Sequence, residues 1–264
     1  MTSNLRTLAV KVPAITAYFW IIKILATTVG ETFADFLNGL LMDTYHLSDA
    51  QGLQLVSGIM GVGLIVVLVA QLRAKRYIPW LYWLAIVFIS VAGTLITDNL
   101  HDGMGVELWV TTSVFAVILA AVFALWYYEE RTLAMKSINT RRREVFYWLA
   151  ILFTFALGTS AGDQLAESVN IGYLASLGVF AAAIAIVFVG WRLKLVGEIT
   201  AFWIAYILTR PLGASLGDLL SQAPKDGGLG LGPNNTSYLF LVLIVGSVIY
   251  LTRTHRDELT AEAN

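Results

Sequence analysis

The chain of 264 residues contains no cysteine, only three histidines and few charged residues. Without cysteine it cannot form disulfides, thiolate metal sites or thiol redox centres. The histidines do not form the paired helical positions that a haem needs. Charged residues make up 13% of the chain, whereas a soluble domain carries about 25%. The composition therefore excludes an ordinary soluble protein, and a net charge of −1 argues against a nucleic-acid partner.

The chain is rich in apolar sequence, because 58% of its residues are hydrophobic. A helix needs about 20 mostly apolar residues to cross a bilayer. Eight such stretches occur, at 14–38, 53–72, 80–100, 107–128, 145–167, 171–191, 199–220 and 236–252. We therefore predict one all-α membrane domain over residues 1–264, with eight transmembrane helices.

A three-residue motif occurs four times in this apolar sequence. Each Trp is followed by a Gly ten residues later and by an Asp fifteen residues later. The four sets are Trp20, Gly30, Asp35; Trp83, Gly93, Asp98; Trp148, Gly158, Asp163; and Trp203, Gly213, Asp218. This regularity predicts four two-helix repeats at about 13–75, 76–140, 141–195 and 196–256, each a motif helix followed by a partner helix.

The distribution of basic residues predicts how the chain is oriented. Fourteen of the 17 Lys and Arg residues fall in segments assigned to one side of the membrane, and Lys225 alone falls in an opposite loop. By the positive-inside rule, both termini are expected in the cytoplasm. All four motif helices then run outward, so the repeats are parallel, unlike the inverted repeats of many transporters.

The motif aspartates are the strongest candidates for a functional site, because a carboxylate in or beside a membrane span is costly. Fifteen helical residues cover about 22 Å, so a Trp near the inner interface places each Asp toward the outer edge. Four carboxylates at one depth predict a ring, or two facing pairs, that binds a ligand or protons. The alternative is that each Asp meets water or caps the next segment. The nearby His46 and His101 with their flanking acids, among them Asp49 and Asp102, resemble a cation vestibule; the alternative, which we favour, is that they lie in solvated loops.

The other motif residues have simpler interpretations. Each Trp follows another aromatic residue, a pattern typical of the aromatic belt at a membrane interface, so we expect the Trp residues to be anchors. Each Gly is expected to allow close helix packing. The alternative for the Gly residues is a local break that opens backbone carbonyls to a cavity.

The first and last repeats differ from the others by carrying charge inside their spans. Lys23, Thr27, Glu31 and Asp35 follow one another at steps of four, so they share one helix face. In the fourth repeat Arg210 occupies the position of Thr27. A buried cation needs a carboxylate partner, so Lys23 and Arg210 are expected to face carboxylates. Arg210 could reach Glu31, which would place the first and last motif helices side by side; this pair has a purely structural alternative.

The segment 18–32, YFWIIKILATTVGET, together with the four motifs, resembles a bacterial family of uncharacterised membrane-anchored proteins with a tandem repeat of unknown function. The resemblance extends over nearly the whole chain. It implies the repeat architecture and a bacterial inner membrane, and it implies no settled activity.

We expect a transporter of a cation, such as Mn²⁺, with proton-coupled efflux as one mode. Carboxylates and hydroxyls without Cys are hard oxygen ligands that suit Mn²⁺, Mg²⁺ or Ca²⁺. The expected ligands or proton sites are Glu31, Asp35, Asp98, Asp163 and Asp218, and the expected charge-compensating or transport residues are Lys23, Thr27 and Arg210.

Two other functional classes remain open: a carrier of an anionic or zwitterionic solute held by Arg210, and a membrane scaffold or sensor. An enzyme is not expected, because no Ser/His or metal-ligating His constellation is present. The expected partners are membrane lipid, a small ion or solute, and a second copy of the chain in a homo-oligomer. No cofactor is expected apart from a bound divalent cation.

Overall fold

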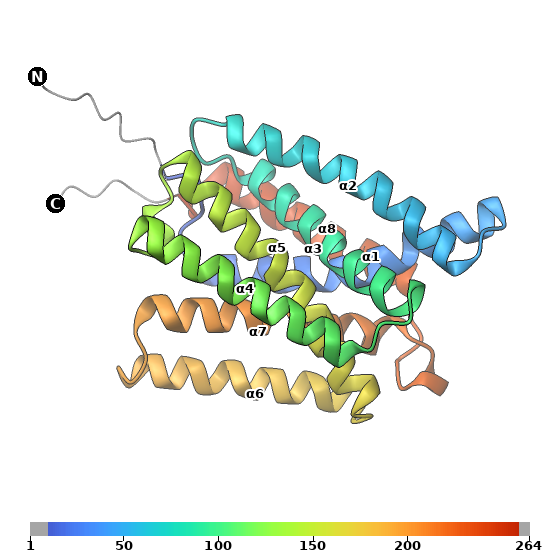
Figure 1. The fold of residues 1–264 in the computed structure, drawn as a ribbon. Coiled ribbons are helices and arrows are strands. Elements are labelled where there is room, and N and C mark those ends of the chain that lie inside the picture. Colours follow the sequence, from blue (N-terminus) through green and yellow to red (C-terminus); the bar gives the residue numbers. More distant parts are fainter. Residues whose placement is uncertain (1–9, 259–264) are drawn as a thin grey trace, which may run out of the picture.

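The computed structural model describes residues 10–258, and this part of the chain folds into eight long helices that lie roughly side by side (Figure 1). The helices are α1 (Ala17–Tyr45), α2 (Asp49–Arg73), α3 (Pro79–Asp98), α4 (Leu108–Glu130), α5 (Arg141–Asp163), α6 (Tyr173–Arg192), α7 (Glu198–Ser221) and α8 (Pro233–Thr254). Short helical turns follow α3, α4, α5 and α7.

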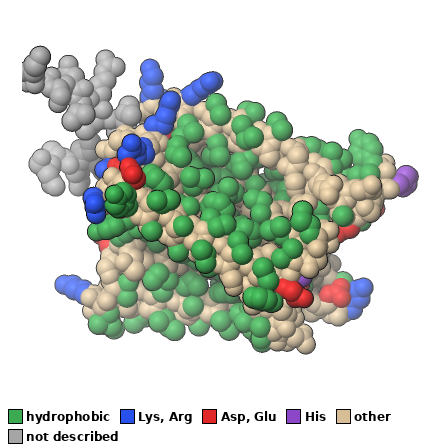
Figure 2. Space-filling model, in the orientation of Figure 1, with side chains coloured by type: hydrophobic (Ala, Val, Ile, Leu, Met, Phe, Trp, Pro, Cys, Tyr) green, Lys and Arg blue, Asp and Glu red, His purple; other side chains and the backbone are tan. Residues whose placement is uncertain are grey.

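Seven of the eight helices are long and apolar enough to cross a membrane, and α1 is the exception. Its sequence carries Lys23, Glu31 and Asp35, which lower its hydropathy. Hydrophobic side chains cover most of the face seen in Figure 2, and Lys and Arg gather mainly at the end from which both chain termini extend (Figures 1 and 2). This surface is typical of a membrane protein. We call that end the basic end, and the opposite end the acidic end.

Local sequence signals explain where several helices begin. Ser48 and Gln51 form a capping box at the start of α2, in which each side chain bonds the backbone N–H of the other. Thr140 caps α5 by accepting a hydrogen bond from the Arg143 backbone N–H. Proline occupies the first helical turn of both α3 and α8, where its missing N–H is not needed.

The four motif helices form a closed ring at the centre of the molecule. Helices α1 and α5 each pack against both α3 and α7. Partner helices surround the ring: α2 packs on α3, α4 on α5, α6 on α7, and α8 on α1. Each partner helix therefore packs chiefly on the motif helix of the next repeat, and the last one closes back onto the first.

The motif glycines make this ring possible. A Cβ at Gly93 would lie 2.6 Å from the Cβ of Phe155, so the two helices could not approach as closely with a larger residue. Equivalent contacts join each glycine to the next helix of the ring, always at the position seven residues after a Trp: Gly30 with Ser90, Gly93 with Phe155, Gly158 with Arg210, and Gly213 with Thr27. The predicted packing role is confirmed, and its repetition requires four motif helices that point the same way.

The prediction that the motif Trp residues are interfacial anchors is wrong for Trp83, Trp148 and Trp203. Trp83, Trp148 and Trp203 are at most 5% exposed, and Trp20 is partly buried. Their rings fill the space between helices, and Trp203 Nε1 donates a 2.9 Å hydrogen bond to the Leu133 carbonyl. The closed ring and its surrounding helices cover the indoles of Trp83, Trp148 and Trp203 and leave Trp20 partly exposed.

Candidate functional site

A stripe of residues at steps of four runs along each motif helix and faces the middle of the ring. Residues at −1, +3, +7 and +11 from each Trp are all buried, although they include charged and polar side chains. Residues spaced by four share one side of a helix. The four stripes therefore build the interior of the protein in layers, from the basic end to the acidic end.

At the acidic end the layers open into a cleft of about 190 Å³, which we call the acidic cleft. Glu31 and the four motif aspartates, at +11 and +15 in their repeats, all line it. The cleft holds eight carboxylates in total: Glu31, Asp35, Asp49, Asp98, Asp102, Asp163, Glu167 and Asp218. The structure thus brings together the five acidic residues that were predicted from the sequence.

Three further lining residues lie one step beyond the motif Asp along the stripe, and two of them, Glu167 and Gln222, were not predicted from the sequence. Asp102, Glu167 and Gln222 each follow a motif Trp by nineteen residues. Short π-helical turns, Asn99–Gly103 and Gln164–Ser168, continue α3 and α5 beyond the motif Asp. Extending the step of four past each Asp would have found them.

Other lining residues come from segments interpreted as solvated loops. His101 and Asp102 follow α3, and Asp49 begins α2. Asp49 and Asp102 are exposed and His101 is partly exposed, as expected of solvated positions, but all three also line the cleft. Asn38 from α1 also lines the cleft and donates a 2.6 Å hydrogen bond to Asp49.

Three of the carboxylates form a tighter group at the bottom of the cleft. Glu31, Asp163 and Asp218, from α1, α5 and α7, each place one carboxylate oxygen within 4.8 Å of the other two. Asp218 is only 6% exposed, and within residues 10–258 it has no hydrogen bond or ion pair from another side chain. Such a group needs protons or a cation to offset its charge.

Arg210 closes the floor beneath this group. The side chain is fully buried, and its Nη2 lies 2.8 Å from Glu31 Oε2. Nη2 also donates to the hydroxyls of Thr94 and, at 2.5 Å, Thr159. Nη1 donates to the Thr27 carbonyl at 3.0 Å. The predicted Arg210–Glu31 pair is confirmed, and this one guanidinium joins α7 to the three other motif helices.

Thr27 contributes to this site through its backbone. Its hydroxyl donates a 2.6 Å hydrogen bond to the Ile24 carbonyl in its own helix. The Thr27 side chain is therefore not available to compensate charge, and only its carbonyl helps to hold Arg210.

Lys23 differs from the expectation that it faces a carboxylate. Its Nζ lies 3.3 Å from Thr209 Oγ1 and 4.3 Å from the centroids of the Phe155 and Tyr206 rings. Within the described residues no carboxylate lies within ion-pair distance of Lys23. The expectation is wrong because Glu31 lies two turns away and bonds Arg210, so aromatic faces take the place of a counter-ion.

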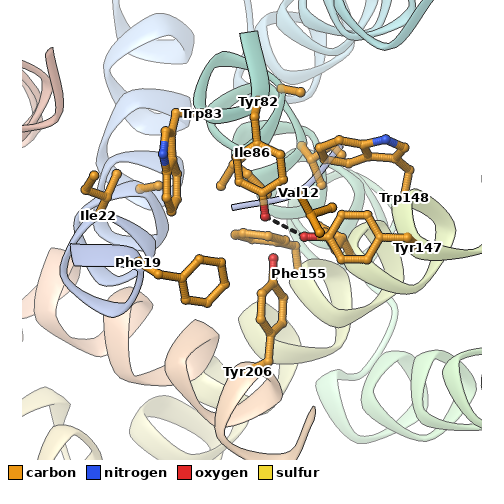
Figure 3. Packing of buried hydrophobic residues seen from close by; sticks show 14 of the residues in the cluster. Val12, Phe19, Ile22, Tyr82, Trp83, Ile86, Tyr147, Trp148, Phe155 and Tyr206 are labelled. Atoms are coloured by element: carbon orange, nitrogen blue, oxygen red, sulfur yellow. Dashed lines mark hydrogen bonds between the residues drawn. The ribbon is translucent and has the colours of Figure 1, made fainter. Parts of the chain in front are cut away.

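The basic half of the ring interior is filled by aromatic residues. The Tyr82 and Tyr147 hydroxyls share a hydrogen bond, and the Tyr206 hydroxyl points toward them beside Phe155 (Figure 3). Phe19 lies on the α1 side of the same group (Figure 3). The three tyrosines are fully buried. This packing separates the acidic cleft from the basic end.

The segment that leads into α1 closes the basic end. Lys11 Nζ forms a buried 2.7 Å ion pair with Glu144 Oε2 and donates to the Leu72 carbonyl. Tyr77 donates a 2.5 Å hydrogen bond to Asp257. Burial raises the pKa of the Asp257 carboxyl and of the Tyr77 hydroxyl above their usual values. These contacts tie the start of the described chain to α2 and α5, and its end to the connection between α2 and α3.

The fold and the site define an all-helical protein of the membrane type, with four tandem repeats around an acidic cleft. The chain belongs to the family of the Repeat of Unknown Function (DUF347), whose model matches residues 18–77, 81–132, 146–194 and 201–257. The family resemblance seen in the sequence is thereby confirmed. No curated protein and no solved structure matches the chain. Its function must therefore be argued from the site.

Proposed function

We propose that this chain is a multi-pass membrane transporter that moves a divalent cation, such as Mn²⁺, through the centre of the ring. The observation that carries the proposal is the convergence of Glu31, Asp163 and Asp218 within 4.8 Å at the bottom of the acidic cleft. Oxygen ligands are the donors that Mn²⁺, Mg²⁺ and Ca²⁺ prefer. The absence of cysteine disfavours softer metals.

The charge balance of the cleft supports a cationic cargo over a purely structural role. Two carboxylate charges 4.8 Å apart repel by about 3 kcal/mol at an effective dielectric constant near 20. Arg210 offsets Glu31, but within residues 10–258 Asp163 and Asp218 have no cationic partner. A divalent cation held by these oxygens would remove the repulsion.

We place the protein in a bacterial inner membrane, with eight spans and both termini in the cytoplasm. Helix α1 is included because its charges lie in the ring interior: Lys23 is fully buried and Glu31 is 6% exposed. The excess of Lys and Arg at the basic end supports a cytoplasmic location for that end. The acidic cleft then opens to the outside, and the tyrosines close the cytoplasmic route.

The alternative anionic or zwitterionic cargo is less well supported. Arg210 already bonds Glu31, Thr94, Thr159 and the Thr27 carbonyl. An anion would also have to pass the carboxylates of the cleft to reach it. The buried Lys23 and the carboxylates favour proton-coupled cation efflux, because intramembrane ionisable groups serve as proton relays.

Transport can be tested in proteoliposomes that contain a Mn²⁺-sensitive dye. The double variant Asp163→Asn, Asp218→Asn keeps the shape of the cleft but removes two charges and two ligands. We expect its initial rate of Mn²⁺ entry to fall at least tenfold while its unfolding temperature is unchanged or higher. Asp43→Asn is the matched control, since Asp43 is exposed and does not line the cleft. Equal rates for the parent and the double variant would leave a scaffold or an anion carrier as the better interpretation.

The orientation has a separate test, because the native chain contains no cysteine. Lys136 and Lys225 are exposed at opposite ends of the molecule. In intact cells, an impermeant thiol reagent is expected to label Lys225→Cys from outside, and to label Lys136→Cys only after the membrane is opened. Labelling of both variants in intact cells would contradict the proposed topology.

A further inference from the structure

Lys23 is the one charged side chain of the ring interior that the proposed cation site does not use. It is fully buried. Thr209 accepts its hydrogen bond at 3.3 Å, and the Phe155 and Tyr206 rings lie 4.3 Å from its Nζ. Aromatic faces stabilise an ammonium ion by cation–π attraction, but less than a carboxylate does. The surroundings therefore tolerate both a protonated and a neutral amine.

The charged and titratable groups near Lys23 come from all four motif helices. Arg210, from α7, also lies over the Phe155 ring, at 5.6 Å. The ionisable hydroxyls are Tyr206 from α7, Tyr82 from α3 and Tyr147 from α5. In α1, Glu31 lies eight residues away and bonds Arg210. The charges of Arg210 and Glu31 therefore act electrostatically on Lys23, although within the described residues Lys23 forms no ion pair with a carboxylate.

We propose that Lys23 is the proton-binding site of the transporter: its amine is protonated when the acidic cleft is empty and loses that proton when a divalent cation binds. This inference rests on the proposed function. Cation binding draws Glu31 away from Arg210, so Arg210 and Lys23 become two uncompensated charges beside one ring. Lys23–NH₃⁺ then becomes Lys23–NH₂ plus H⁺, the N–H bonding pair staying on nitrogen.

The size of the effect follows from the distance along α1. Eight helical residues cover about 12 Å. At that distance and an effective dielectric constant near 20, a doubly charged cargo and one ammonium repel enough to weaken binding by about a hundredfold. Cation binding in the cleft and protonation of Lys23 therefore weaken each other, although the two sites share no ligand. Proton-coupled cation transport requires such a linkage.

The released proton has a polar route toward the basic end. The Tyr206 hydroxyl is buried and, within the described residues, has no hydrogen-bond partner. It points toward the bonded hydroxyls of Tyr82 and Tyr147 (Figure 3). The Tyr82 ring lies 5.8 Å from that of Tyr77, which bonds Asp257. Hydroxyls can pass protons, whereas the packed rings block a metal ion.

The experiment measures Mn²⁺ binding to the purified full chain by calorimetry in buffers of different ionisation enthalpy, which gives the protons released per ion. Electron spin resonance of free Mn²⁺ gives the affinity between pH 6 and 8. Lys23→Met is expected to release one proton fewer than the parent and to bind Mn²⁺ up to about a hundredfold more tightly at the low-pH end. Lys225→Met, on the exposed loop after α7, is the matched control and is expected to match the parent.

Lys23→Arg provides a second, opposite variant, because its guanidinium keeps the charge at all these pH values. It is expected to release one proton fewer but to bind Mn²⁺ weakly throughout. A purely structural role of Lys23 would not move the two affinities in opposite directions. If the parent chain binds no Mn²⁺, the proposed function itself fails. If the parent binds Mn²⁺ and both variants release as many protons as it does, only the assignment of Lys23 is overturned.

Discussion

The two halves of the ring interior are built from the same stripe of residues, yet they have opposite characters. In the acidic half, position +15 of every repeat and position +11 of the first supply carboxylates that line an open cleft. In the basic half, positions −1 and +3 supply mostly aromatic and aliphatic side chains that fill the interior completely. The repeat therefore provides the helix packing, and the residue type at each layer decides whether that layer is open or closed.

The boundary between the halves is also where the repeats cease to be equivalent. The motif glycines make matching contacts around the whole ring. The charged residues Lys23, Glu31 and Arg210 occur only in the first and fourth repeats, whose motif helices pack against each other. The packing is therefore symmetric and the charge is not, and in the proposed transporter the α1–α7 contact would bind both cargo and protons.

Removing the positive charge at the boundary should cause the largest loss of stability. Arg210→Gln leaves the buried Glu31 without its partner and breaks bonds to three helices, so we expect a loss of about 3–5 kcal/mol in unfolding free energy. Denaturant unfolding in detergent would measure it. Exposed Arg192→Gln is the control and should change little.

The same boundary pair allows a double-mutant test. The double variant Glu31→Gln, Arg210→Gln should lose clearly less unfolding free energy than the two single variants added together. Each single variant leaves one buried charge without its partner, whereas the double variant leaves none. Additive losses would show that the two halves are not joined through this pair.

The basic half has its own buried ion pair, and breaking it should have the next largest effect. Glu144→Gln leaves Lys11 uncompensated, although Lys11 keeps its bond to the Leu72 carbonyl. We expect a loss of about 2 kcal/mol. The loss of this pair should also loosen the segment that leads into α1. In Tyr147→Cys, the thiol should therefore react faster with a small thiol reagent when Glu144→Gln is also present than when Glu144 is intact. An unchanged reaction rate would mean that the basic end is closed by the aromatic residues alone.

The sequence predicted the features that depend on spacing along one helix. The repeat, the helices, the packing glycines and the Arg210–Glu31 pair follow from regular intervals and from the cost of buried charge. It did not predict the buried Trp residues or the aromatic surroundings of Lys23, because these depend on which helices cover which face. Glu167 and the place of Asp102 on the helix stripe were not predicted, because π-helical turns extend α3 and α5 past their apolar spans.

A glycine substitution tests whether the ring depends on the close approach of its motif helices. Gly93→Ala places a methyl group 2.6 Å from the Phe155 Cβ and 3.0 Å from the Phe155 carbonyl carbon. Overpacking of this kind typically costs about 1–3 kcal/mol. Gly61→Ala, in α2, meets nothing within 4 Å and should stabilise the helix by about 0.5–1 kcal/mol. Equal effects of the two changes on the unfolding free energy would show that close approach of α3 and α5 is not required.

The smallest expected effect concerns a single charge of the acidic cleft. Asp98 lines the cleft but lies outside the Glu31, Asp163 and Asp218 group. Because like charges there repel, Asp98→Asn should raise the unfolding free energy by about 0.5–1 kcal/mol without metal, the usual size of such an interaction. Asp43→Asn, outside the cleft, should have no effect. If the cleft binds Mn²⁺ as proposed, adding Mn²⁺ should stabilise the folded parent by mass action, and this gain should be smaller in Asp98→Asn because the cleft attracts the cation less strongly. If Asp98→Asn is less stable than the parent without metal, Asp98 stabilises the acidic half. The contrast between an acidic half whose carboxylates repel one another and a tightly packed basic half would then be wrong.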